Sequence, residues 1–518
     1  MALATAESVY ADLRALRDRY EVATALDRQE TSVGQRHDSL RATADRRLAG
    51  IDSAALPPAD RRALEIMRRT LARDLTPLGA DSQTAPTPDP ASSCAYDPAT
   101  VAAGPGGLDS LRDQIYACYA WTQHHLVVDG DTLDRLTVLG EVRRATEPER
   151  RRRLFLALGP VWRSMNRNDG AESPYRRLIR LEARHRAAAG GPSDSGGALG
   201  VSSDTVEQWL LRILETWRAA TPDSMVEPWD WLYAAGACDR ALGAHIPLAR
   251  LLPLTDSVFL ALGADVGALG VHYDLVPREG KTPVAFTTFG ARARLRGGRW
   301  TGAEPWVFAT YRTGGLDNLN ELLHETGHAV HIAAIRTRPA YADWPDSDPL
   351  SEALGDFVAL DVYEPAWQAR WLGDSVPLAE GLRGRYAGIV LDVAWALFET
   401  RMLRDPHADP NAVWTAITGD YLRIRPHPEL SWWAMRGQLV DAPGYMMNYA
   451  FGAVLIAAIR ERTRVLHHPF TAGDSSWYAW VAPRLFRFGL ERPSREVLRE
   501  FLGGEVTVEA ILRDMRRK

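Results

Sequence analysis

The chain has 518 residues, of which 46% are hydrophobic and 25% are charged, so it has ample material for a large hydrophobic core. A formal charge of −5 gives no reason to expect a nucleic acid as a partner. No stretch approaches the uninterrupted apolar length of a membrane span, so a membrane partner is not expected either.

Two further features bear on the cellular location. The first twenty residues carry acids and arginines where a signal peptide needs an apolar run. The three cysteines, Cys94, Cys118 and Cys238, are scattered and odd in number, which argues against a disulfide framework and for a reducing compartment. We therefore expect a cytoplasmic protein.

The N-terminal part of the chain is expected to be helical. Residues 5–75 alternate apolar and charged side chains at helical period, with breaks near Gly34 and at Leu56-Pro57-Pro58. Residues 76–107 are rich in proline, serine, threonine and glycine. They predict a long irregular segment, which is either a surface loop or a cover over a cleft.

A boundary is expected near the middle of the chain. Helices are predicted over residues 108–125 and 133–158, and residues 189–204 are small, polar and glycine-rich, which is typical of a flexible connection. We therefore expect an N-terminal helical subdomain, residues 1–190, and a catalytic subdomain, residues 191–518.

Short strands are predicted after an amphipathic helix over residues 204–218. Residues 285–290 and 306–311 favour strands, and Gly297-Gly298 between them favours a hairpin turn. The edge of such a small sheet can pair with an extended peptide through main-chain hydrogen bonds.

Two cations, Arg278 and Lys281, precede these strands in a turn. They either bind a carboxylate of the substrate or only stabilise the turn, and both interpretations stay open.

The stretch Leu316–Arg336 predicts a helix that carries the motif H-E-x-x-H, with no proline before Pro339. His324 and His328 are four positions apart, so both imidazoles lie on one face and can reach one metal ion. Glu325 stands beside them as the base that activates water. The alternative is a chance match on a buried helix.

A catalytic zinc ion has three protein ligands and one open position, so a third ligand is expected downstream. Residues 351–360, SEALGDFVAL, predict a second helix with Ser351 as its N-cap. Glu352 and Asp356 share one face of it. One carboxylate can bind the metal while the other accepts the free ring N–H of a ligating histidine. The alternative is two acids on a solvated face, but the helix is otherwise apolar and a buried acid needs a partner.

These motifs carry a family resemblance. The sequences HETGHAVH and SEALGDFVALDVYEP resemble zinc peptidases related to thimet oligopeptidase, neurolysin and angiotensin-converting enzyme. The resemblance implies one zinc ion bound by His324, His328 and Glu352, with Glu325 as general base and Asp356 supporting a ligand histidine. It also implies a mostly α-helical body with a deep channel, a small β-sheet beside the metal helix, and short peptides as substrates.

The resemblance extends over roughly residues 205–515. Tyr273–Lys281 is similar to the D-L-x-P-R-E-G-K segment of the oligopeptidases, and His331 resembles an extra histidine of that branch. The chemistry does not require His331, so a packed or hydrogen-bonded histidine is expected there. Further helices are predicted over residues 379–403 and 410–423.

The stretch Ala442–Gly452 leads into an apolar helix. In the resembling families a tyrosine near such a helix start donates a hydrogen bond to the oxyanion, and one such donor is worth about 3 kcal/mol in the transition state. Tyr449 matches this tyrosine best, and Tyr445 lies one helical turn earlier; the alternative is that both only pack. The families carry a histidine shortly before this tyrosine, and this chain has no histidine at that place. His427 is the nearest histidine and is the candidate for substrate binding.

The sequence therefore predicts a zinc-dependent metallopeptidase that hydrolyses short peptides as an oligopeptidase or peptidyl carboxypeptidase. A second hypothesis, motivated by the missing histidine, keeps the zinc but assigns an amide or related bond of a dedicated small molecule in a biosynthetic pathway. A third hypothesis is a catalytically silent, metal-stabilised binding protein, and the intact Glu325 argues against it.

Overall fold

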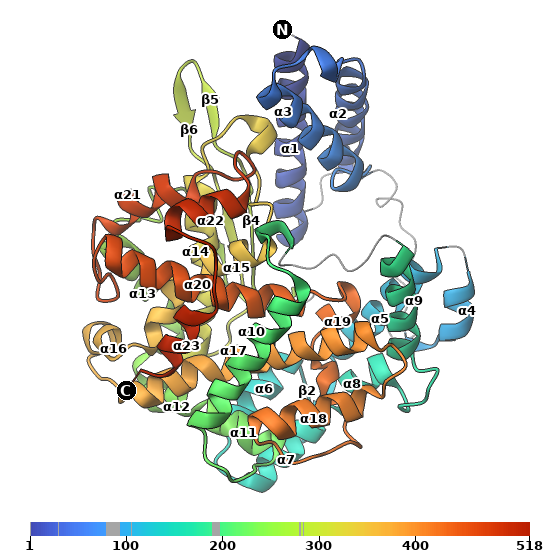
Figure 1. Ribbon diagram of the computed structural model, residues 1–518, viewed down its shortest axis with the longest axis vertical. Helices are drawn as coiled ribbons and strands as arrows, with labels where there is room; N and C mark the ends of the chain where they lie inside the picture. Colours follow the sequence, from blue (N-terminus) through green and yellow to red (C-terminus); the bar gives the residue numbers. More distant parts are fainter. Residues whose placement is uncertain are drawn as a thin grey trace.

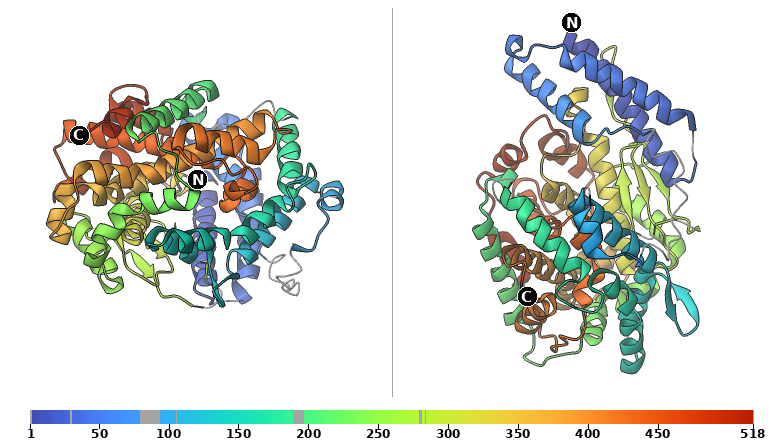
Figure 2. Two further views of the ribbon diagram at one scale, coloured as in Figure 1. Left: turned by 90° about the horizontal axis from the view of Figure 1, so that it is seen from below. Right: turned by 90° about the vertical axis from the view of Figure 1, so that its right-hand side faces the viewer.

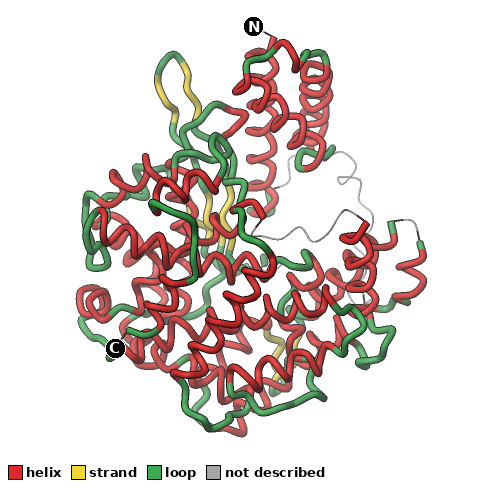
Figure 3. The backbone as a smooth tube through the Cα atoms, viewed as in Figure 1, coloured by secondary structure: helices red, strands yellow, loops and turns green. Residues whose placement is uncertain are grey.

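The computed structural model describes residues 2–28, 31–78, 94–104, 106–188, 197–278, 281–282 and 284–517. Helices make up most of this part of the chain, and each of its strands is only three residues long (Figures 1 and 3). The mostly α-helical fold is thereby confirmed. None of the helices in the described ranges combines the length and the apolarity that crossing a bilayer requires.

The first three helices form a layer at one end of the molecule (Figure 2): α1 (Ala2–Ala25), α2 (Thr31–Ala49) and α3 (Pro58–Arg73). The predicted break before Pro58 is confirmed, since α3 begins at this residue. A proline is tolerated there because it lies in the first turn of the helix. The predicted break near Gly34 lies a few residues earlier, because α1 ends at Ala25 and α2 begins at Thr31, so Gly34 itself is inside α2. A helical glycine costs only about 1 kcal/mol, and the packing of α2 on α1 offsets such a cost.

Ion pairs join this N-terminal layer to the body. Arg292 bonds Asp18 at 2.9 Å, and Arg14 bonds Asp343 at 2.7 Å. Arg338 bonds Glu7 at 2.7 Å. The Asp18 and Arg292 side chains are only 3% and 9% exposed, so this pair is removed from water and each charge needs the other.

The next helices follow the prediction only in part. Residues 79–93 of the expected irregular segment lie outside the described residues, and α4 (Pro98–Ala103) falls inside the remainder, where no helix was expected. The region predicted as one helix, residues 133–158, contains two helices, and only its first residue belongs to a strand, β2 (Asp131–Leu133), which pairs with β1 (Leu126–Val128). These helices and their neighbours are α5 (Gly107–Thr122), α6 (Arg135–Arg144), α7 (Pro148–Leu156), α8 (Gly159–Asn166) and α9 (Pro174–Ala188).

The cysteine prediction is wrong. Cys94 and Cys118 form a disulfide, which joins the segment before α4 to α5, while Cys238 is free and buried. Their separation of 24 residues gave no hint of a pair, because the contact arises only from the way the two segments fold together.

One cluster of buried apolar side chains extends from Leu111 to Leu512 and includes residues on both sides of position 190. The division into two subdomains remains a prediction. Besides three central helices described below, the helices that contribute to this core after the boundary are α10 (Ser203–Ala220), α11 (Pro228–Ala235), α12 (Ala237–Leu242), α13 (Leu251–Ala261), α16 (Pro365–Leu372), α17 (Leu378–Arg404), α18 (Pro410–Leu422), α19 (Gln438–Asp441), α21 (Trp477–Val481), α22 (Ser494–Leu502) and α23 (Glu509–Met515).

The predicted small sheet is confirmed. It has the order β3-β7-β4, in which β3 (His272–Asp274) runs parallel and β4 (Phe286–Thr288) antiparallel to β7 (Trp306–Phe308). The hairpin of β5 (Arg294–Arg296) and β6 (Arg299–Thr301) turns at Gly297-Gly298, where both residues have positive φ and glycine is therefore favoured. Strands β4 and β7 pack against the helix that carries H-E-x-x-H.

Three helices meet at the centre of the body: α14 (Leu316–Ala334), α15 (Asp348–Ala359) and α20 (Met446–Leu466) (Figure 1). The two predicted helices of the motif region are confirmed, but the N-cap of α15 is Ser347, not Ser351. The Ser347 side chain accepts a hydrogen bond from the Leu350 N–H, and Pro349 then occupies the first turn.

Glycines set the distance between these helices. A Cβ at Gly327 of α14 would lie 2.4 Å from the carbonyl oxygen of Gly355 in α15. A Cβ at Gly452 of α20 would lie 3.2 Å from the carbonyl oxygen of Pro349 and 3.3 Å from the Cβ of Glu352. The backbones can approach this closely only because these positions have no side chain.

The substitution Gly327→Ala is expected to destabilise the fold, because the new methyl group meets backbone rather than a movable side chain. Overpacking of this kind costs about 1–3 kcal/mol. Gly388→Ala is the matched control, since a Cβ at this exposed position of α17 has nothing within 4 Å and alanine favours a helix by roughly 0.5–1 kcal/mol. Thermal unfolding in a metal chelator measures both; equal stability of Gly327→Ala and wild type would contradict the close approach.

Candidate metal centre

The structure brings His324, His328 and Glu352 together. On α14 the two imidazoles lie one turn apart, and α15 presents Glu352 to them; one donor atom from each residue lies within 4.8 Å of the others. The Nε2 atoms of His324 and His328 are 3.0 Å apart, and His324 Nε2 lies 3.6 Å from Glu352 Oε2. The predicted ligand set is thus one spatial group.

This donor set fits zinc. Atoms held at about 2.0–2.1 Å around a tetrahedral ion lie about 3.3 Å apart, and the two measured separations fall on either side of that value. Two imidazoles and one carboxylate leave a fourth position open, which is the pattern of catalytic sites; structural sites use four protein ligands.

Neighbouring groups shift the pKa values of the two histidines in opposite directions. Asp356 lies 2.8 Å from His324 Nδ1, so that nitrogen carries the proton and Nε2 faces the site. Burial lowers the pKa of His324, but Asp356 and Glu352 outweigh it and hold that pKa well above the usual value. Burial, with His324 and His331 nearby, holds the pKa of His328 well below its usual value, so this imidazole is neutral, the form that ligates.

Gly355 makes room for the imidazoles. A Cβ at this position of α15 would lie 2.8 Å from His328 Nε2 and 2.9 Å from His324 Cε1. The glycine in the motif E-A-L-G-D therefore leaves the space that the two imidazoles occupy. The spacing of the motif residues did not indicate this steric requirement.

Glu325 is oriented by a residue that the sequence did not single out. Thr287 of β4 donates a hydrogen bond to Glu325 Oε2 at 2.7 Å and lies 2.9 Å from the Glu325 carbonyl oxygen. Burial raises the pKa of Glu325, although His324 and the Thr287 hydrogen bond lower it. A carboxylate whose pKa lies above the usual value is a better proton acceptor near neutral pH.

The two tyrosines of α20 differ in their contacts. The Tyr445 hydroxyl donates a hydrogen bond to Glu352 Oε1 at 3.1 Å, so it touches a candidate metal ligand directly. The Tyr449 hydroxyl accepts from Gln438 at 3.4 Å, and the centroids of the two tyrosine rings are 5.4 Å apart. Both side chains therefore border the metal centre.

Glu399 of α17, which the sequence also missed, holds the start of α20. Its carboxylate accepts hydrogen bonds from the backbone N–H groups of Gly444 at 2.7 Å and Met446 at 2.9 Å, on either side of Tyr445. Burial raises the pKa of Glu399 to about 8, even though the two backbone hydrogen bonds lower it.

The remaining candidates have partners outside the centre. Lys281 donates to the carbonyl oxygens of Asp274 and Ala309, and Arg278 bonds Asp27 and Asp274, so both cations stabilise the turn. His427 lies 2.7 Å from both Glu227 and Glu429. A role of these three residues in substrate binding remains a prediction. His331 is fully buried, with its ring next to Trp344 and Phe486.

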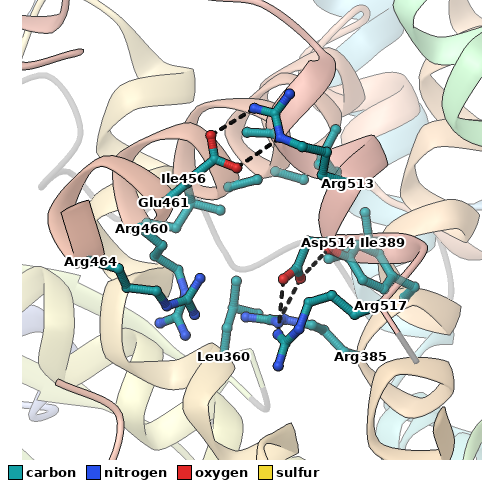
Figure 4. A pocket seen from close by; sticks show the side chains of 15 residues that line it. Leu360, Arg385, Ile389, Ile456, Arg460, Glu461, Arg464, Arg513, Asp514 and Arg517 are labelled. Atoms are coloured by element: carbon teal, nitrogen blue, oxygen red, sulfur yellow. Dashed lines mark hydrogen bonds and ion pairs between the residues drawn. The ribbon is translucent and has the colours of Figure 1, made fainter. Parts of the chain in front are cut away.

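A cavity of about 220 Å³ lies away from this centre, between α17, α20 and α23 (Figure 4). Two of its arginines are paired with acids of the same lining, with Arg385 at 2.9 Å from Asp514 and Arg513 at 2.7 Å from Glu461. Its lining contains none of the metal-centre residues, so it is separate from the candidate site.

No protein-family model matches this sequence, and no curated protein matches it. Solved structures do match the fold. PZ peptidase A, solved with an inhibitor, has a TM-score of 0.59 at 13% identity, over 98% of this chain and 95% of its own. The M32 carboxypeptidase from Deinococcus radiodurans R1 has a TM-score of 0.55 at 13% identity, over 99% of this chain and 98% of its own.

Metallocarboxypeptidase 1 from Trypanosoma cruzi also has a TM-score of 0.55 at 13% identity, over 100% of this chain and 99% of its own. The fold of these helical peptidases is thus shared along nearly the entire chain.

Glu399 predicts a pH dependence of stability. Its pKa is about 8 in the fold against 4.5 ordinarily, so between these values the folded chain holds a proton that the unfolded chain has lost. The contribution of this proton to the free energy of unfolding is fully present below about pH 4.5 and disappears as the pH rises through 8.

The variant Glu399→Gln should therefore lose less stability than wild type between about pH 5 and about pH 9, although it is less stable overall because its amide nitrogen cannot accept a hydrogen bond. Denaturant unfolding in a chelator measures this. Parallel pH profiles for the two proteins would contradict the assignment.

Proposed function

We propose that this protein is a zinc metallopeptidase that hydrolyses short peptides. The observation that carries the proposal is the convergence of His324, His328 and Glu352 beside a Glu325 carboxylate that Thr287 holds in place. A purely structural metal site needs no such carboxylate, and this argues against a catalytically silent binding protein.

Each residue has a role in the proposed reaction. His324, His328 and Glu352 hold the zinc ion, and Asp356 fixes the orientation of His324. When bound, zinc lowers the pKa of water and polarises a carbonyl group. Glu325 takes a proton from the attacking water and passes it to the leaving amine.

Tyr449 donates a hydrogen bond to the oxyanion, while Tyr445 holds Glu352 and thereby positions a ligand. The two hydroxyls border the same centre but have different partners, so their roles are separable by experiment.

Three observations support short peptides as the substrate class. The sequence motifs resemble those of oligopeptidases, and the matched structures are peptidases and carboxypeptidases. In addition, β4 is an edge strand next to Glu325, and an extended peptide can pair with such an edge. Endopeptidase and carboxypeptidase action are both compatible with these features.

The alternative is a zinc hydrolase that acts on an amide or related bond of a dedicated small molecule. It is favoured by the absence of a histidine shortly before Tyr449, where the resembling peptidases carry one. A zinc-loaded protein that cleaves no member of a diverse peptide library would favour this alternative. The Cys94–Cys118 disulfide removes the cysteine argument for a reducing compartment, and a cytoplasmic location remains a prediction.

The variant Glu325→Gln should keep its zinc and lose about 10²–10⁴-fold in kcat/KM on a fluorogenic peptide library, because an amide cannot accept the proton. The control is His328→Ala, which should lose the metal itself. Elemental analysis separates the two outcomes, and an active Glu325→Gln enzyme would refute its role as the base.

The two tyrosines should respond differently to removal of the hydroxyl. Tyr449→Phe is expected to lower kcat by about 10²–10³-fold with zinc affinity unchanged, because it removes an oxyanion donor. Tyr445→Phe is expected to weaken zinc binding by about 10–100-fold, because it removes the hydrogen bond to Glu352. Competitive zinc titration and steady-state kinetics measure both, and the reverse pattern would exchange the two roles.

A further inference from the structure

A second group of metal-ligating side chains lies at the end of α20. His467 and His468 directly follow that helix, and Asp474 lies in the turn before α21. One ring nitrogen from each histidine and one carboxylate oxygen lie within 4.8 Å of one another. The proposed peptidase reaction uses none of these residues.

Both histidine side chains face the same carboxylate oxygen. His467 Nε2 lies 2.7 Å, and His468 Nε2 3.3 Å, from the same oxygen, Asp474 Oδ2. Ligands of a tetrahedral zinc ion are about 3.3 Å apart, so the atoms need to move little to receive one. The two rings are stacked with centroids 4.0 Å apart, so these adjacent side chains point the same way.

Neighbouring groups hold the carboxylate and one imidazole in this arrangement. The backbone N–H and the hydroxyl of Ser476 donate to Asp474 Oδ1 at 3.0 and 2.8 Å, which leaves Oδ2 to face the histidines. The indole of Trp480 stacks on His467 with centroids 5.0 Å apart.

We propose that His467, His468 and Asp474 bind a divalent transition-metal ion, with zinc as the first choice. Two imidazoles and one carboxylate suit zinc, whereas magnesium and calcium require oxygen ligands. The His468 side chain is 50% exposed, so the ion can enter from solvent and keep a water ligand. The ion joins the end of α20 to the turn before α21.

The test counts zinc ions in a chain without a histidine tag. Titration against a competing chromophoric chelator should find two zinc ions per wild-type chain and one in His328→Ala, in which the peptidase centre is impaired. Adding His468→Ala to that background should weaken the remaining site at least tenfold. Adding His407→Ala instead, which removes an exposed histidine elsewhere, should leave it unchanged.

Thermal unfolding gives a second readout that does not involve activity. Zinc should raise the Tm of His328→Ala and should not raise the Tm of His328→Ala/His468→Ala, while magnesium should raise neither, because only a ligand that binds the folded chain stabilises it. In chelator the two variants should unfold alike, which shows that the exposed His468 is not needed for folding.

Two results would overturn the proposal. One is that His328→Ala binds no zinc ion at about 0.1 mM free zinc, where any site with a lower dissociation constant is mostly filled. The other is a second zinc ion that survives His468→Ala or that His407→Ala removes equally well. Neither result depends on whether the protein is a peptidase.

Discussion

The metal centre depends on the close approach of two helix backbones, Gly327 of α14 against Gly355 of α15. This contact brings the imidazoles of one helix within reach of the carboxylates of the other. Gly452 lets α20 pack closely on the segment that carries Glu352, so the tyrosines at the start of α20 lie near that residue. Three positions without side chains therefore determine how far apart the reacting groups stand.

The second constraint is charge. Glu325, Glu352 and Asp356 bring three carboxylates close together, with Glu325 buried and the other two partly buried, so the repulsion between them is only partly screened by solvent. In the metal-free chain His324 relieves this repulsion, and its raised pKa is the consequence. A divalent cation among the same residues does so more fully, and His324 must then give up its extra proton for Nε2 to ligate.

Features encoded by local spacing were predictable from the sequence. The H-E-x-x-H helix, the helix that carries Glu352 and the glycine hairpin all rest on patterns a few residues long. Contacts between distant segments were not predictable. Thr287 reaches Glu325 across 38 residues and Glu399 reaches Gly444 across 45, and both sit in segments whose local pattern only suggests packing. The Cys94–Cys118 bond was missed for the same reason.

The ion pairs between the N-terminal layer and the body have a consequence for how the protein can be divided. Asp343 and Arg338 belong to the connection between α14 and α15, and their partners are Arg14 and Glu7 of α1. Removal of the first helix would leave several half-buried charges without their partners, next to the connection that sets the ligand geometry. The first helix therefore supports the connection next to the candidate metal centre, and its removal is expected to disturb the arrangement of the ligands.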